Sequence, residues 1–130
     1  MMSQKPSKEM YSYWIPARPS KKIDNLNNSK FGKWLIFVPV KDIDKVWEQI
    51  KIATEQNLLG FSSQSSTQLG WHLYNKPSDY VICVHTYDYD DINDVKRVRE
   101  ELRKLGFNET LKYKTDKATL QGVEEYLYEY

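Results

Sequence analysis

The sequence predicts an α+β domain in which helices cover one face of a mainly antiparallel sheet. Residues 33–38 and 80–86 are apolar and β-prone, as buried strands are. Residues 42–57 and 91–104 instead repeat apolar side chains at helical spacing. Shorter β-prone segments lie between them, which gives the expected order β-β-α-β-β-β-α-β-α. At 130 residues, the chain has the length of one such domain.

The sequence begins with a polar stretch that an aromatic one follows. Residues 1–9 are predicted to form a flexible tail, and residues 10–130 to form the domain. Residues 11–15 (YSYWI) predict a short strand, which Pro16 ends because proline has no N–H to donate to a neighbouring strand. The polar residues 20–32 that come next predict a loop.

The segment 33–38 predicts a strand in the middle of the sheet or under a helix, because both of its faces are apolar. One face carries Trp34, Ile36 and Val38, and the other carries Leu35 and Phe37. The helix predicted over residues 42–57 has an apolar stripe that spacing places on one side, with Asp42 available to cap its start. This stripe consists of Ile43, Val46, Trp47, Ile50 and Ala53.

The second half of the chain predicts further strands and two more helices. Residues 61–69 are rich in Ser and Gln and predict a strand or loop, residues 70–74 predict a short strand, and residues 111–114 predict another. The second helix starts at Asp90 or Asp91 and buries Val95, Val98, Leu102 and Leu105. Its charged residues predict a solvated face; they include Arg97, Arg99, Arg103 and Lys104. A last helix, capped by Thr115, is expected to align Leu120, Val123 and Leu127.

Composition argues against some classes of function but does not identify one. Nineteen basic residues oppose 18 acidic ones, and the net charge of +1 argues against a protein that coats extended nucleic acid. One local basic pocket for an anion is still compatible with this charge. The single cysteine, Cys83, excludes an internal disulfide framework. No apolar run reaches the ~20 residues of a membrane span, so we expect a cytoplasmic protein without membrane contact, in the host cytoplasm if the source is a virus.

Aromatic and basic residues combine at two places in the sequence. Trp14 could stack on a planar ring, while Arg18 and Lys33 could pair with phosphate. Near the end of the chain, Lys112 and Lys114 share one strand face and precede Thr115 at the start of a helix. Ammonium groups next to free helix N–H groups would make an anion-binding corner. An edge strand protected by lysines explains the same pattern without a ligand.

A hydroxyl-rich run and a Cys–His pair are the other candidates. Residues 62–67 could bind phosphate through hydroxyl groups, with Ser65 and Thr67 as the contacts, or could form a plain polar edge. Cys83 and His85 share a strand face, but buried cysteine is common and the pair is expected to be structural. The only other histidine is His72 and no metal-binding spacing occurs, so we expect no metal and no cofactor.

Five motifs in this order resemble a small family of bacterial, viral and eukaryotic proteins related to the human basophilic-leukaemia-expressed protein. The motifs are YWI (13–15), GKWLIFVP (32–39), VICVHTYDYD (81–90), RVREELRKLGF (97–107) and YKTD (113–116). Members are often labelled phosphothreonine lyase domain proteins. The family is similar in fold to the mRNA-cap-binding translation initiation factor, which implies a curved sheet backed by helices and the concave face as the binding site.

The sequence and this resemblance predict a non-catalytic binding module for a phosphorylated, nucleotide-derived ligand. In a virus, such a module could sequester a nucleotide signal. The expected contacts are Trp14, Arg18, Lys33, Ser65, Thr67, Lys112, Lys114 and Thr115. Two alternatives stay open: a phosphothreonine lyase that uses Lys112 or Lys114 with His85, and a protein-interaction module whose Tyr-rich residues 126–130 bind a partner or a second copy in a homodimer.

Overall fold

Six strands form one antiparallel sheet in the computed structural model, which describes residues 4–21, 29–73 and 77–130. Their order across the sheet is β1-β3-β4-β2-β5-β6. The strands are β1 (Trp14–Ala17), β2 (Gly32–Pro39), β3 (Ser62–Ser66), β4 (Asp79–Thr86), β5 (Lys112–Thr115) and β6 (Tyr128–Glu129). The predicted α+β class with a mainly antiparallel sheet is therefore confirmed.

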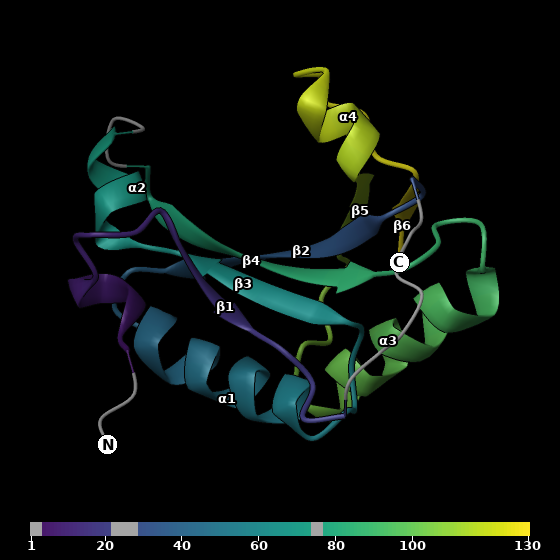
Figure 1. The fold of residues 1–130 in the computed structure, drawn as a ribbon, viewed down its shortest axis with the longest axis horizontal. Coiled ribbons are helices and arrows are strands. Elements are labelled where there is room, and N and C mark those ends of the chain that lie inside the picture. The colour runs from purple at the N-terminus through teal and green to yellow at the C-terminus, as the bar shows by residue number, and fades with distance from the viewer. Residues whose placement is uncertain (1–3, 22–28, 74–76) are drawn as a thin grey trace.

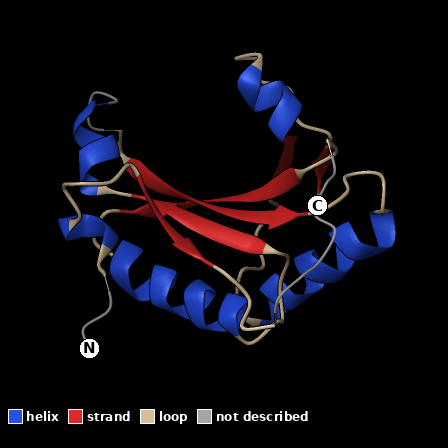
Figure 2. Cartoon of the chain, in the orientation of Figure 1, coloured by secondary structure: helices blue, strands red, loops and turns tan. Residues whose placement is uncertain are grey.

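Four α-helices lie on the two sides of this curved sheet. The long helices α1 (Ile43–Glu55) and α3 (Ile92–Lys104) run beneath its convex face, as Figure 1 shows. The short helices α2 (Gln68–Leu73) and α4 (Asp116–Leu120) rise at opposite ends of the concave face. Between them the strands have no helix above them (Figure 2). We call this concave side the open face.

The core lies between the convex face and the two long helices. β2 and β4 are the central strands and pair along their whole length, with Trp34 opposite Val84 and Ile36 opposite Ile82. These four side chains are buried against α1 and α3, as the alternation in β2 predicts. Trp34 also donates its indole N–H to the carbonyl oxygen of Val95 in α3, 3.0 Å away.

Two details of the long helices differ from the predictions. The Asp42 side chain makes no capping hydrogen bond at the start of α1, whereas Asp91 accepts one from the N–H of Asp94 in α3. The larger difference is Arg99, which is fully buried although the sequence predicts a solvated side chain. It donates to the carbonyl oxygens of Tyr130, Phe107 and Glu109, so the loop after α3 and the residue that follows β6 satisfy its N–H groups.

The ends of the predicted elements also need correction. Residues 70–74 were expected to form a strand, but Gln68–Leu73 is helix α2, where Trp71 donates its backbone N–H to the Thr67 carbonyl. The last helix stops at Leu120, and Gly122 follows with a φ of 67°. The chain then returns to the sheet as β6 instead of continuing as a helix.

The start of the chain contacts the domain where the structure describes it. Pro6–Lys8 forms a 3₁₀ turn, η1, in which Pro6 is buried. The backbone N–H and the hydroxyl of Ser7 both donate to the carboxylate of Asp44 in α1. Of the tail predicted over residues 1–9, residues 1–3 lie outside the described residues.

Candidate functional site

Strand register arranges the side chains of the open face in transverse rows. Side chains alternate between the two faces of a strand, so residues paired across the sheet share a face. One row lies near α4, where Ser62 pairs with His85, His85 with Lys33, and Lys33 with Lys114. Arg18 joins this row from the end of β1 by donating to the Ser62 hydroxyl. We call Arg18, Ser62, His85, Lys33 and Lys114 the basic row.

The three cations of the basic row differ in how accessible they are to a ligand. Lys33 is only 7% exposed, and its ammonium lies 2.9 Å from the Asp116 carboxylate and 2.7 Å from the Thr119 hydroxyl of α4. Arg18 is exposed and bound to a neutral hydroxyl. Lys114 is half-buried and has no ion-pair partner among the described residues. Three cations against one carboxylate give the row a positive charge.

His85 occupies the centre of this row as a neutral imidazole. Burial, helped by the nearby cations Lys33 and Arg18 and opposed by Asp116, lowers its pKa to about 4. The Phe61 ring lies 5.9 Å from the imidazole, centroid to centroid. The Nδ1 atom is buried and has no hydrogen-bond partner within the described part of the chain. The site thus contains a polar atom that the described protein does not satisfy.

Cys83 lies one row further from α4 and is equally unsuited to nucleophilic chemistry. Burial raises the pKa of its thiol to about 11, and Gln64 hydrogen-bonds to it. With the pKa of His85 near 4, neither a thiolate nor an imidazolium forms at neutral pH. The structural interpretation of this pair is thus favoured over catalysis.

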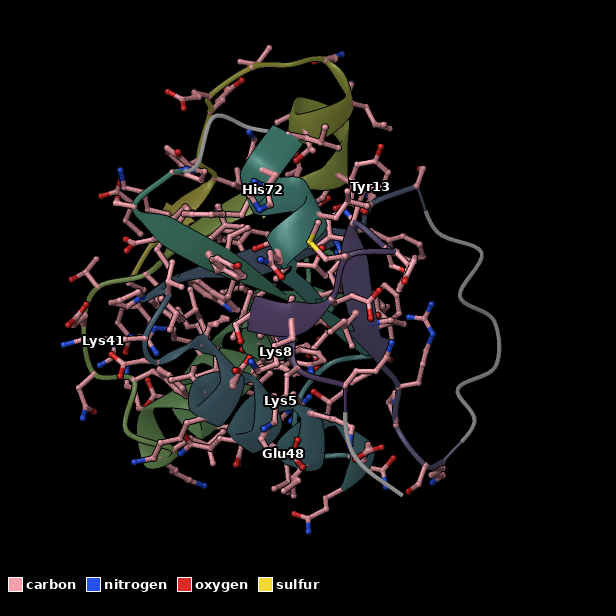
Figure 3. All side chains as sticks on the ribbon, turned by 90° about the vertical axis from the view of Figure 1, so that its left-hand side faces the viewer. Lys5, Lys8, Tyr13, Lys41, Glu48 and His72 are labelled. Carbon is pink, nitrogen blue, oxygen red and sulfur yellow. The ribbon has the colours of Figure 1, made fainter. Side chains whose placement is uncertain are left out.

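An aromatic pocket of about 300 Å³ opens at the other end of the open face, near α2. Its walls include Tyr13, Trp14, Phe37, Trp71 and Tyr80. Trp14 is 39% exposed and Tyr13 is 53% exposed, so both rings are accessible to a ligand. Figure 3 views the molecule from this end, with Tyr13 and His72 labelled near α2.

The aromatic pocket and the basic row lie on one face, separated along the strands. Val81 lines the pocket and His85 lies in the basic row, four residues further along β4. At ~3.3 Å per residue, the two regions are about 13 Å apart. A ligand with a ring at one end and phosphate groups at the other could reach both.

Most of the predicted contact residues reach this face. Trp14 borders the aromatic pocket, and Arg18, Lys33 and Lys114 belong to the basic row. Thr115 is next to that row, but its hydroxyl already accepts the backbone N–H of Ala118 and caps α4. This helix has only five residues, and the cap occupies a donor that the predicted anion-binding corner would need.

The remaining predicted residues do not join the basic row. Ser65 is fully buried on the helix-covered face, because β3 directs Ser62, Gln64 and Ser66 to the open face instead. Thr67 is also fully buried and donates to the Ser12 carbonyl oxygen. Lys112 pairs with Leu35 and so shares the open face with Lys114, but it lies one row further from α4, with its ammonium 4.6 Å from the centre of the Tyr126 ring.

Sequence reasoning missed Ser62 and Gln64 on the open face. Both belong to the hydroxyl-rich run, so the residue types were noticed but the face was not assigned. No sequence signal could have identified them, because a run without apolar residues does not show which side chains face the core. In the structure Ser63 bonds to Thr54 of α1, so its neighbours Ser62 and Gln64 face the open side.

A larger cavity, of about 550 Å³, lies at the edge of the sheet between the second half of β2, α1 and the loop after α3. Lys45 and Lys112 line it together with Asp42 and Glu109, so its charges balance. It therefore offers less to an anion than the basic row does. Over the described ranges, no cluster of three or more His, Cys, Asp or Glu side chains could hold a metal ion. None of the helices described is both long and apolar enough to cross a membrane.

Comparison with models of known families identifies the family of this chain. A family model described as basophilic leukemia-expressed protein Bles03 matches residues 23–120. The chain belongs to the Bles03 family. The resemblance noted from its five motifs is thereby confirmed. A search of curated proteins finds no significant match.

Solved structures similar to this Bles03 family member are cap-binding factors. A schistosome eIF4E complexed with m7GpppG and 4E-BP superposes with a TM-score of 0.70 at 13% identity, over 98% of this chain and 75% of that one. The same factor with m7GpppA gives a TM-score of 0.69 at 14% identity and equal coverage. C. elegans eIF4E-3, in complex with Mextli and a cap analog, gives 0.57 at 17% identity, over 80% of this chain and 61% of that one. At these identities the likeness establishes the fold, which agrees with the expected similarity.

Proposed function

We propose that this chain is a non-catalytic binding module that holds a phosphorylated, nucleotide-derived ligand on the open face of its sheet. The observation that carries the proposal is the placement of an aromatic pocket and a basic row on the same face, about 13 Å apart along the strands. An aromatic surface binds the face of a base, and cations bind phosphate oxygens. Nucleotides combine these two chemistries in one molecule.

Each region has a defined part in this proposal. Trp14 stacks on the ring of the ligand beside Tyr13, because both side chains are exposed in the wall of the aromatic pocket. Arg18 and Lys114 pair with phosphate, since neither is held by a carboxylate in the described structure. Lys33 attracts the phosphate from a buried position, and the Asp116 carboxylate partly neutralises its charge.

The similar structures support the ligand class. Schistosome eIF4E is complexed with m7GpppA or m7GpppG, both of which carry bases joined by phosphates. The fold that this chain shares with them is thus compatible with such a ligand on a curved sheet. In keeping with this ligand class, we place the protein in the cytoplasm, where in a virus it would sequester a nucleotide signal of the host.

Calorimetric titration of the full chain tests the proposal. The panel comprises ATP, a dinucleoside triphosphate (ApppA), m7GpppG, a cyclic dinucleotide and inorganic tripolyphosphate. We expect Arg18→Ala and Lys114→Ala each to weaken the bound nucleotide about tenfold or more, the loss expected for one charge-assisted hydrogen bond. Lys104→Ala is the matched control, because it removes an exposed lysine from α3 on the opposite side of the sheet.

The ring subsite has a separate test in the same titration. Trp14→Ala should weaken ATP or ApppA by about fivefold or more, as loss of one stacking contact does, and leave tripolyphosphate unaffected. The proposal is wrong if no member of the panel binds, or if Arg18→Ala and Lys104→Ala behave alike.

The lyase alternative has little support in the site geometry. A phosphothreonine lyase needs a general acid, and in the free protein burial keeps the pKa of His85 near 4, so its imidazole is neutral. Lys112, one candidate base, lies outside the basic row with its ammonium against the Tyr126 ring. Release of phosphate from a phosphothreonine peptide, lost in His85→Gln, would restore this alternative.

The interaction-module alternative depends on the Tyr-rich residues 126–130. In the structure these tyrosines have partners within the domain: Tyr128 donates to the Tyr89 carbonyl oxygen, and the Tyr130 ring lies under Arg103 at 4.4 Å. They therefore complete the edge of the sheet. A change in solution mass on deletion of residues 126–130, with the fold intact, would favour this alternative.

A further inference from the structure

We propose that His85 is the proton-accepting residue of the basic row, and that an anion binding to this row brings a proton with it. This inference rests on the proposed function, because it concerns the same site. It goes further by assigning a role to a residue that the ligand contacts predicted from sequence do not include. It also makes affinity depend on pH in a defined direction.

The position of His85 is the first argument. It lies between Ser62 and Lys33 in the basic row, so its ring is beside the place where an anion would bind Arg18 and Lys114. Its side chain is only partly buried as a whole, yet its Nδ1 atom is enclosed and lacks a hydrogen-bond partner in the described structure. Buried polar atoms are normally satisfied, so a nitrogen without a partner, close to the cations Lys33 and Arg18, needs an explanation.

The charged groups around the ring give the second argument. They are Arg18 after β1, Lys33 on β2 and Asp116 at the start of α4, with the neutral Cys83 on β4 itself. Lys114 on β5 lies one strand further away, beyond Lys33 in the same row. Among the described residues, cations outnumber carboxylates around the imidazole. This excess, added to burial, opposes a further positive charge on His85 in the free protein.

A bound anion reverses that balance. A doubly charged phosphate or sulfate group on Arg18 and Lys114 would bring two negative charges close to the imidazole, which favours the imidazolium form. Because the bound state then holds more protons than the free state, affinity must rise as the pH falls. The phosphate of a nucleotide and a free inorganic anion would act alike, since charge alone drives the proton uptake.

Inorganic sulfate is the suitable first probe, since it keeps its double charge between pH 5.5 and 7.5. NMR titration of the imidazole signals of the full chain gives the pKa of His85 in chloride and in sulfate at equal ionic strength. We expect sulfate to raise this pKa by more than one unit. Sulfate affinity should then increase about tenfold between pH 7.5 and 5.5 if the bound-state pKa reaches about 6.5. Titration of ApppA, whose charge is also constant in this range, should show the same trend.

Two variants separate this inference from the proposed function. His85→Gln keeps a polar side chain that takes up no proton, and should remove the rise in sulfate affinity between pH 7.5 and 5.5. His72→Gln, which changes the other histidine, at the end of α2, should leave the pH dependence intact. Anion binding that requires Arg18 but does not change with pH, with an unshifted His85 pKa, overturns the inference and leaves the proposed function standing. Absence of any Arg18-dependent anion binding overturns both.

Discussion

Lys33 is a buried cation whose charge is already paired within the protein. Its ammonium is held by the Asp116 carboxylate at 2.9 Å and by the Thr119 hydroxyl at 2.7 Å. This contact fastens α4 to β2 and satisfies a charge that would otherwise be costly to bury. At the same time, Asp116 occupies a position on Lys33 that a ligand phosphate would take, so it competes with the ligand inside the site.

Replacing Asp116 with asparagine should therefore strengthen anion binding. In Asp116→Asn the side-chain oxygen can still accept from Lys33, but the competing negative charge is gone. We expect the affinity for a bound nucleotide or for sulfate to rise about three- to tenfold, measured by calorimetry. The free energy of unfolding should fall by about 1–2 kcal/mol, because a charge-assisted hydrogen bond becomes a weaker one.

Glu100→Gln is the matched control for this change. It also removes one carboxylate, but from an exposed position on α3. Its anion affinity should equal that of the wild type. Weaker binding in Asp116→Asn than in Glu100→Gln would contradict a competing role for Asp116.

The sequence predicts which residue types form the site more readily than it predicts the face of the sheet on which each side chain lies. Trp14, Arg18, Lys33 and Lys114 were selected for their chemistry, and strand pairing places all four on or beside the open face. Ser65 was selected on the same chemical grounds, yet it faces the core. In a run of serines the apolar alternation that reveals the buried face is missing, so the sequence carries no signal for the register.

At the scale of elements, Arg99 connects α3 to the end of the sheet. From the buried side of the helix, its guanidinium donates to three backbone carbonyl oxygens, two in the loop after α3 and one at Tyr130 beyond β6. The Tyr130 oxygen also accepts the backbone N–H of Leu111, at 3.0 Å. Arg99 thus satisfies backbone carbonyl groups of this loop, as a capping residue satisfies the free backbone groups at a helix end.

Arg99→Met should destabilise the protein strongly. It removes three part-buried, charge-assisted hydrogen bonds at once, and we expect the free energy of unfolding to fall by about 3 kcal/mol or more in chemical denaturation. Arg103→Met is the matched control: Arg103 lies over the Tyr130 ring at 4.4 Å and donates to none of these carbonyls, so its loss should cost about 1 kcal/mol or less. Equal costs for the two variants would contradict the assigned role of Arg99.

The long elements were predictable and the short ones were not. α1, α3, β2 and β4 each have enough residues for their periodicity to be read, and their predicted limits lie within a few residues of the structure. α2 has only six residues, too few to separate helical from strand spacing, and was expected to be a strand. β6 has only two residues and forms because β5 offers it an edge, which is a tertiary effect.

At the scale of the whole molecule, the two sides of the curved sheet have different roles. The convex side buries the aromatic and aliphatic core under α1 and α3, which provides the stability. On the concave side, α2 and α4 rise at the two ends (Figure 1). This side carries the polar, charged and aromatic side chains of the basic row and the aromatic pocket. Substitutions on the open face should therefore change binding more than folding.

The most direct test of this account is to map a bound nucleotide on the full chain by backbone and side-chain NMR. On titration with ApppA, we predict that the signals that shift come from the open face: the Trp14 and Trp71 indoles at one end and Lys33, His85 and Lys114 at the other. Signals of the exposed faces of α1 and α3 should stay in place. Shifts confined to those helices or to the cavity beside the loop after α3, or no shift with any nucleotide of the panel, would contradict the central claim.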